Sequence, residues 1–204
     1  MRRGPVALLF ATLPEAEPFI KGLKLKRTVS APFPVYKGRG LALVLSGIGK
    51  ADAAMAAAWT CERLSPRVLV NLGAAGAVGK KLDPGDCLQI SRAVEPDRPG
   101  LRTGAPREHF PEALKGFRNA VIATQDRPIL SAADRRRLLR LADLADMETS
   151  AFIQACRRFG RSCFAFKFVT DAPGHSSGED IVRGIRKHRD SFFSFFLSAV
   201  LPSL

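Results

Sequence analysis

Strand-like and helix-like segments alternate along this chain from one end to the other, and this alternation restricts the folds open to it. The run VALLFATL at 6–13 predicts a buried strand, and PEAEPFIKGL at 14–23 begins a helix. KADAAMAAAWTCERL at 50–64 has strong helix propensity. Further strands are predicted at 41–49, 67–76, 86–95, 119–126 and 162–171, and further helices at 131–144, at 145–160 and from 178 onward. The alternation predicts an α/β fold, a single domain over 1–204 with a central mixed, largely parallel sheet flanked by helices.

Composition agrees with a folded domain and restricts the location of the protein. The 204 residues are 46% hydrophobic and 25% charged, which is ordinary for a globular protein with a sizeable core. No run approaches the roughly 18 apolar residues of a membrane span. The N-terminal arginines and apolar run faintly resemble a signal peptide, but Glu15 and Glu17 follow where a small-residue cleavage site belongs. We therefore expect a cytoplasmic protein.

The basic charge of the chain leaves its partners open. Lys and Arg number 32 against 19 Asp and Glu, a formal net charge of +13. Basic residues are dispersed apart from clusters at 134–141 and 183–190, and aromatic residues do not alternate with them. We favour a well-solvated surface and expect no nucleic-acid partner, with a polyanion as the alternative. For the phenylalanines at 192–196 we favour a helix docked on the sheet or in a dimer contact over a membrane surface.

Motifs for metals and nucleotide cofactors are missing from the sequence. The four cysteines form no C-x-x-C pair and share no ligand spacing with the histidines, so we expect reduced thiols and no metal. SGIGKADAA at 46–54 and GAAGAVG at 73–79 are predicted glycine-rich turns after strands, but neither has the dinucleotide or P-loop spacing. We expect no cofactor. Such turns still lie where α/β sheets form ligand crevices.

An acidic residue heads the apolar stripe of the helix predicted at 145–160. Asp146 is placed to cap this helix, and the stripe runs through positions 148, 151, 152, 155, 156 and 159. Glu148 is its first member. An unpaired carboxylate is costly in a protein interior, so Glu148 is a candidate site residue, although a first-turn acid interacting with the helix dipole is the alternative.

Two more acids lie beside strand ends. Glu15 follows the first strand, and Asp171 ends the strand predicted at 162–171. Strand ends on one edge of a sheet can place Glu15, Glu148 and Asp171 in a single crevice. The alternatives are a helix-dipole interaction for Glu15 and a turn cap for Asp171.

Four motifs resemble those of a known family. SGIGKADAA, RVLV followed by NLGAAGAVG, DMETSAFIQAC and FKFVTDA occur in this order at fitting intervals. They resemble the methylthioadenosine/S-adenosylhomocysteine nucleosidases, members of the purine nucleoside phosphorylase superfamily, over nearly the whole chain. The resemblance implies an N-glycosidase that releases adenine or a related base from a purine nucleoside, and a homodimer.

The resemblance also implies roles for individual residues. Asp171 would protonate or hydrogen-bond the departing purine at N7. Glu148 would hold the ribose hydroxyls with Met147 packed against the sugar, and Glu15 would position the attacking water, with Glu17 as the alternative. Three further residues would border the ribose or the base: Ile48, Ala75 and Gly76.

The acceptor and the substituent at the 5′ position are less determined. Related phosphorylases hold phosphate with an arginine and a hydroxyl residue, where this chain has Asn71 and Ala74. Water is therefore favoured, with a phosphorylase or a non-catalytic nucleoside-binding protein as alternatives. Methylthioadenosine, futalosine and adenosylhopane all suit the motifs, and the arginines at 98, 102 and 107 are candidates to bind a bulky or anionic 5′ group.

Overall fold

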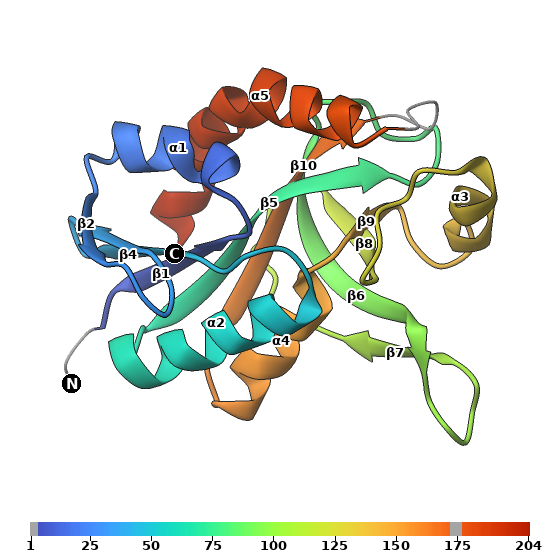
Figure 1. The fold of residues 1–204 in the computed structure, drawn as a ribbon, viewed down its shortest axis with the longest axis horizontal. Coiled ribbons are helices and arrows are strands. Elements are labelled where there is room, and N and C mark those ends of the chain that lie inside the picture. The colour runs from blue at the N-terminus through green and yellow to red at the C-terminus, as the bar shows by residue number, and fades with distance from the viewer. Residues whose placement is uncertain (1–3, 172–176) are drawn as a thin grey trace.

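The computed structural model describes residues 4–171 and 177–204 (Figure 1). Its strands are β1 (Val6–Phe10), β2 (Lys26–Val29), β3 (Val35–Gly38), β4 (Leu41–Leu45), β5 (Val68–Ala77), β6 (Cys87–Pro99), β7 (Pro106–His109), β8 (Asn119–Thr124), β9 (Leu144–Asp146) and β10 (Cys163–Asp171). Its helices are α1 (Leu13–Gly22), α2 (Lys50–Leu64), α3 (Ala132–Leu138), α4 (Thr149–Arg158) and α5 (Gly178–Phe195), the last continued by short turns at Phe196–Val200 and Leu201–Ser203.

All the strands belong to one mixed sheet, as the alternation predicts. Strands β4, β1, β5 and β10 form a parallel run, and β6, β8 and β9 form a second one. The long strand β5 joins the two runs because it pairs with β10 along most of its length and with β9 at its end. Strand β6 pairs with β10, so this part of the sheet closes on itself. The carboxyl ends of β1, β5 and β10 consequently lie at the same edge.

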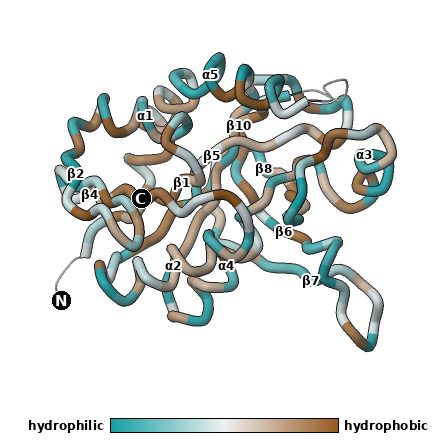
Figure 2. Tube along the Cα trace, in the orientation of Figure 1, coloured by the Kyte–Doolittle hydropathy of each residue, from teal (hydrophilic) through white to brown (hydrophobic). Residues whose placement is uncertain are grey.

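Helices cover both faces of the sheet (Figure 1). Helices α1 and α5 pack on one face, and α2 and α4 on the other. Hydrophilic and hydrophobic residues alternate along α5 in Figure 2, as expected for a helix with one buried side. Its phenylalanines supply much of that side: the ring of Phe192 lies 4.8 Å from that of Phe168, and Phe196 lies 5.2 Å from Phe19.

Phe192 and Phe196 are almost fully buried inside this chain, which confirms the docked helix for those two side chains. No helix in the described part of the chain combines the length and the apolar character needed to cross a bilayer.

Two predicted helices have different bounds in the structure. The helix predicted at 131–144 ends at Leu138, because Leu144 is taken into β9 between β5 and β8, where it is fully buried. The helix predicted at 145–160 begins at Thr149. Asp146 ends β9, yet its carboxylate still accepts the backbone N–H of Thr149 at 3.0 Å. Strand pairing between distant segments overrides helix propensity in both places.

The predicted apolar stripe of α4 is buried except at its last member, and the buried face is wider than the stripe. Phe159, its last member, is 39% exposed just beyond the helix, whereas Ser150, which is not part of the predicted stripe, is fully buried. The reason lies in the first turn of α4, where the backbone N–H of Ser150 donates to the hydroxyl oxygen of Thr124 on β8. Packing of α4 against the sheet therefore buries a wider face than the periodicity indicates.

The glycine-rich segment at 73–79 is not a turn at its start. Strand β5 continues through Gly73 and Gly76 to Ala77, which confirms the strand predicted at 67–76, and the predicted turn begins only after Ala77. Pairing with β10 holds these residues in the sheet. Side chains from neighbouring elements occupy the space that a Cβ would need at Gly73 and Gly76. The glycines thus permit close approach to the strand rather than a change in its direction.

Candidate active site

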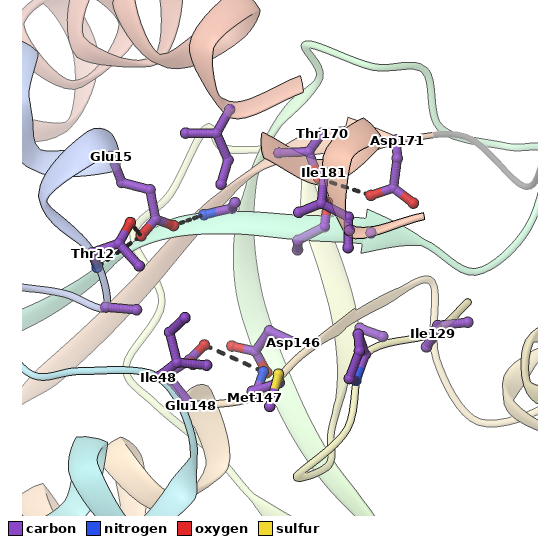
Figure 3. A pocket seen from close by; sticks show the side chains of 18 of the residues that line it. Thr12, Glu15, Ile48, Ile129, Asp146, Met147, Glu148, Thr170, Asp171 and Ile181 are labelled. Atoms are coloured by element: carbon purple, nitrogen blue, oxygen red, sulfur yellow. Dashed lines mark hydrogen bonds between the residues drawn. The ribbon is translucent and has the colours of Figure 1, made fainter. Parts of the chain in front are cut away.

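A cavity of about 290 Å³ opens at the sheet edge where β1, β5 and β10 end. Figure 3 shows acidic side chains on different sides of it. The residues predicted for the site all line the cavity: Glu15, Ile48, Ala75, Gly76, Met147, Glu148 and Asp171. Glu17 does not line it. Its carboxylate forms ion pairs with Lys21 at 2.6 Å and Arg189 at 2.7 Å, which excludes it as the alternative to Glu15.

Glu15 is held in place by backbone groups of two elements. One carboxylate oxygen accepts the backbone N–H of Thr12 at 3.0 Å, as in an N-terminal capping motif. The other accepts the N–H of Ala74 on β5 at 2.8 Å. A Cβ on Gly73 would lie 2.8 Å from this second oxygen, so glycine is needed for the contact. Glu15 does interact with the start of α1, but it also reaches across to the end of β5.

Glu148 connects α4 to the glycine turn before α2. Its Oε1 accepts the N–H of Gly49 at 2.9 Å, and its Oε2 accepts the N–H of Met147 at 3.2 Å. Burial raises the pKa of Glu148 to about 7, and repulsion from the Asp146 carboxylate adds to this rise. Lys167 and the Gly49 N–H act in the opposite direction. Glu148 can therefore change its charge near neutral pH.

Asp146 lines the cavity and Lys167 lies directly behind it, and neither residue was assigned to the site from the sequence. Lys167 is buried on β10, and its Nζ lies 3.0 Å from Oδ2 of Asp146. Burial by itself would lower the pKa of Lys167, but the negative charge of Asp146 and of both glutamates outweighs it and raises this pKa. The signal in the sequence was a lysine inside the apolar strand FAFKFVTD.

Asp171 is held on both of its carboxylate oxygens. The hydroxyl of Thr170 donates to Oδ1 at 2.8 Å, and the guanidinium of Arg135 lies 2.9 Å from Oδ2. A Cβ on Gly76 would lie 3.1 Å from Oδ1, which shows how closely the carboxylate approaches β5. Arg135, from α3, was not predicted. The segment 172–176, where the alternative of a turn cap falls, lies outside the described residues.

The positions considered for phosphate binding carry no anion-binding side chain. The amide oxygen of Asn71 accepts the hydroxyl of Thr149 at 3.1 Å, and Asn71 does not line the cavity. Ala74 does line it, but its backbone N–H is occupied by Glu15. Sites for phosphate need free N–H donors or a cation at this place.

The arginines considered for a 5′ group lie elsewhere in this chain. Residues 98, 102 and 107 belong to the β6–β7 hairpin, which extends away from the helices (Figure 1), and none of them lines the cavity. Arg98 contacts Glu95 at 3.5 Å instead. An arginine that does line the cavity is Arg127, whose guanidinium pairs with Asp134 at 2.9 Å.

The fold is an α/β sheet with helices on both faces, and a cavity lined by buried acidic residues lies at the carboxyl ends of its strands. The chain belongs to the phosphorylase superfamily, whose family model matches residues 5–200. Within that superfamily it is similar to nucleosidases, in agreement with the resemblance seen in its motifs.

Three relatives illustrate the similarity. The aminodeoxyfutalosine nucleosidase of Campylobacter jejuni is 25% identical over 86% of this chain and 89% of the relative. The methylthioadenosine/S-adenosylhomocysteine nucleosidase of Streptococcus pneumoniae, solved with 8-aminoadenine, has a TM-score of 0.86 at 20% identity, covering 98% of this chain and 100% of the other. The futalosine hydrolase of Helicobacter pylori has a TM-score of 0.84 at 17% identity, covering 97% of each chain.

Proposed function

We propose that this protein is an enzyme that hydrolyses the N-glycosidic bond of a purine nucleoside and releases the free base. The observation that carries the proposal is the convergence of Glu15, Glu148 and Asp171 on one cavity (Figure 3). The cavity offers apolar walls, such as Ile48 and Met147, together with these few polar groups, as small-molecule sites do. The nucleosidases among its relatives support the same reaction.

Glu148 and Glu15 would act on the sugar side. Cleavage of the bond places positive charge on the ribose ring, as in other glycoside hydrolyses. An ionised Glu148 beside the ribose hydroxyls stabilises that charge in a site with little water, with Met147 packed against the sugar. Glu15 would orient a water molecule toward C1′ and take its proton. Lys167 keeps this acidic group of residues from carrying an excess of negative charge.

Asp171 would act on the base. When the C1′–N9 bond breaks, its electron pair passes to the purine, and Asp171 would give its carboxyl proton to N7 to neutralise the leaving group. Asp171 would meet that N7–H beside Ala75 and Gly76, which form the adjoining wall. The water oxygen then forms the new bond to C1′. Glu15 takes one proton from the water, and the return of a proton from Glu15 to Asp171 through solvent replaces the one given to N7, so the net reaction consumes one water molecule.

Water is the acceptor that the site favours. Asn71 and Ala74 offer no phosphate site. The carboxylate of Glu15 occupies the N–H of Ala74, and its negative charge would repel a phosphate ion at this place. Methylthioadenosine, futalosine-type and adenosylhopane-type nucleosides remain alternatives for the natural substrate. A phosphorylase and a non-catalytic nucleoside-binding protein remain alternatives for the function. A homodimer in the cytoplasm is part of the proposal.

A panel of purine nucleosides with different 5′ groups, assayed with and without phosphate, tests the proposal. We expect release of free base in phosphate-free buffer. Asp171→Asn should bind nucleoside but lose roughly 10²–10⁴-fold in kcat, the usual contribution of acid–base help. Turnover that needs phosphate would establish a phosphorylase. Nucleoside binding without turnover in either buffer would establish a non-catalytic protein.

A further inference from the structure

Helix α2 is capped by side chains from other parts of the chain. It begins directly after Gly49, which has no side chain to accept an N–H group. The N–H groups at the start of a helix have no partner within it and need acceptors from elsewhere. Glu148 accepts the N–H of Gly49 at 2.9 Å, and Oδ1 of Asp126 accepts the N–H of Lys50, also at 2.9 Å. The start of α2 thus connects Asp126 with the glutamate proposed to bind the ribose.

The turn before α2 depends on such contacts because glycines form it. Gly47 has a φ of +92° and Gly49 a φ of +108°, which glycine adopts freely and residues with a side chain rarely adopt. The N–H of Gly47 fixes the start of the turn by donating to the carbonyl oxygen of Ala11 at 3.1 Å. At the other end, the direction of the Gly49 N–H depends on what holds Gly49 and Lys50.

Asp126 is itself fixed by a closed ring of hydrogen bonds. Its backbone N–H donates to Oδ2 of Asp97 on β6 at 3.1 Å, and Nζ of Lys50 donates to Oδ1 of Asp97 at 2.8 Å. The bond from the Lys50 N–H to Asp126 completes the ring. Burial by itself would lower the pKa of Lys50, but the hydrogen bond to Asp97 and the surrounding carboxylates outweigh it and raise this pKa. The lysine therefore stays charged and holds the ring at neutral pH.

This ring lies behind two walls of the cavity. Ile48, two residues before Lys50, lines the cavity (Figure 3), and so does Arg127, which directly follows Asp126. Asp126 is not among the lining residues, and its side chain is 56% exposed. Any effect of Asp126 on a bound nucleoside therefore passes through its neighbours.

We propose that Asp126 is a positioning residue that caps α2 from outside the helix and thereby holds the Gly49 N–H on the carboxylate of Glu148. The inference rests on the proposed function, because it takes Glu148 as the group that stabilises the ribose. Without the acceptor at Asp126, the end of the glycine turn gains freedom, and the bond from Gly49 to Glu148 weakens.

The charge of Glu148 is what this bond influences. Burial raises the pKa of Glu148 most, and the charges of Asp146 on β9 and Glu15 on α1 add to the rise. Lys167 on β10 and the Gly49 N–H lower this pKa. Loss of the Gly49 contact therefore raises the pKa further. Less of the ionised form, which stabilises positive charge on the ribose, is then present at neutral pH.

Asp126→Ala and Asp126→Asn form a matched pair for the test. Both remove the same negative charge, but the amide oxygen of asparagine still accepts the Lys50 N–H, and asparagine caps helices about as well as aspartate. We expect the acidic limb of the kcat/KM–pH profile to lie about one pH unit higher in Asp126→Ala than in Asp126→Asn. Below that limb, kcat/KM should be about tenfold lower in the alanine variant.

The assay is release of base from 5′-methylthioadenosine, or from the fastest nucleoside of the panel, on both sides of neutral pH. Circular dichroism establishes that each variant is folded. Asp126→Leu, which resembles asparagine in shape but has no acceptor, replaces Asp126→Ala if the latter does not fold. Equal profiles for the alanine and asparagine variants would overturn the inference. A loss in Asp126→Ala that is the same at every pH would assign Asp126 a purely structural role and also overturn it.

The amide resonance of Gly49 in NMR spectra gives a readout that needs no turnover. Its chemical shift should follow the ionisation of Glu148, with a midpoint at about 7 in the wild type and close to it in Asp126→Asn. In Asp126→Ala the midpoint should move to higher pH and the amplitude should fall. Identical titrations in the two variants would overturn the inference.

The two readouts separate this inference from the proposed function. A protein that hydrolyses no nucleoside, but shows the expected difference at Gly49, overturns the hydrolase and supports the positioning role of Asp126. An enzyme that hydrolyses nucleosides with the same pH profile in both variants leaves the proposed function in place and overturns the inference alone.

Discussion

Replacing Glu148 by glutamine should make the protein relatively more stable as pH rises. Glu148 has a pKa of about 7 in the folded protein against an ordinary value of 4.5, mainly because it is buried. A carboxyl group whose pKa is raised on folding stabilises the folded state only while it is protonated, so its contribution is lost as pH rises through 7. Glutamine has the same shape and cannot ionise, so the variant avoids this loss.

The size of the effect follows from the shift in pKa. At about 1.4 kcal/mol per pH unit, the change from 4.5 to about 7 corresponds to about 3 kcal/mol. The difference in unfolding free energy between Glu148→Gln and the wild type should therefore grow by about 3 kcal/mol between pH 4.5 and pH 8. For a chain of this length this is a relative shift of about 6–12 °C in Tm.

Urea unfolding of both proteins at several pH values measures this growth. The absolute difference at any one pH also contains a local loss, because the amide nitrogen of glutamine cannot accept the N–H of Met147. The change of this difference with pH does not contain that local loss, because the loss is the same at every pH. Glu17→Gln is the matched control: its pKa is lowered by Lys21 and Arg189, so no comparable growth is expected. A difference that stays constant from pH 4.5 to pH 8 would refute the reasoning.

Three further substitutions test other parts of the structure. Lys167→Met leaves Asp146 without its buried cationic partner and should lower the free energy of unfolding by about 3–5 kcal/mol. Lys26→Met, at an exposed position, should change it little, and equal effects of the two substitutions in urea unfolding would contradict this. Gly73→Ala places a methyl group 2.8 Å from the Glu15 carboxylate and should reduce kcat by on the order of 10²-fold in a folded protein. Unchanged steady-state turnover would argue against Glu15 as the water-positioning residue. Phe192→Ala empties a buried site under α5 and should cost about 3–5 kcal/mol in thermal or urea unfolding, while a loss below 1 kcal/mol would mean that α5 docks without it.

Much of the fold could be predicted because it follows from the local propensity and hydrophobic periodicity of each segment. The helix expected at 50–64 has the same bounds in the structure, and the strand expected at 162–171 differs by one residue. These segments have propensities that agree with their tertiary environment. The prediction was wrong for a turn beginning at Gly73 and for a helix over 139–144: pairing with β10 keeps β5 extended to Ala77, and pairing with β5 and β8 holds Leu144 in β9.

The candidate site was predictable only in its acids and in the motifs around them. Glu15, Glu148 and Asp171 could be proposed because an acid beside a strand end or on an apolar stripe is unusual in a single sequence. Arg135 could not be proposed in this way, since it is one of several arginines in a basic helix. Its distinction is that it is the buried arginine of α3, which depends on how that helix packs.

The sequence by itself therefore determined the class of fold and the acidic character of the cavity. The tertiary structure decided which charges face one another. Glu148 meets the backbone of Gly49 across 99 residues, and Asp171 meets Arg135 across 36. The physical reason is that periodicity and propensity act between neighbours in the chain, whereas the interaction of two buried charges depends on their separation in space and on the absence of water between them.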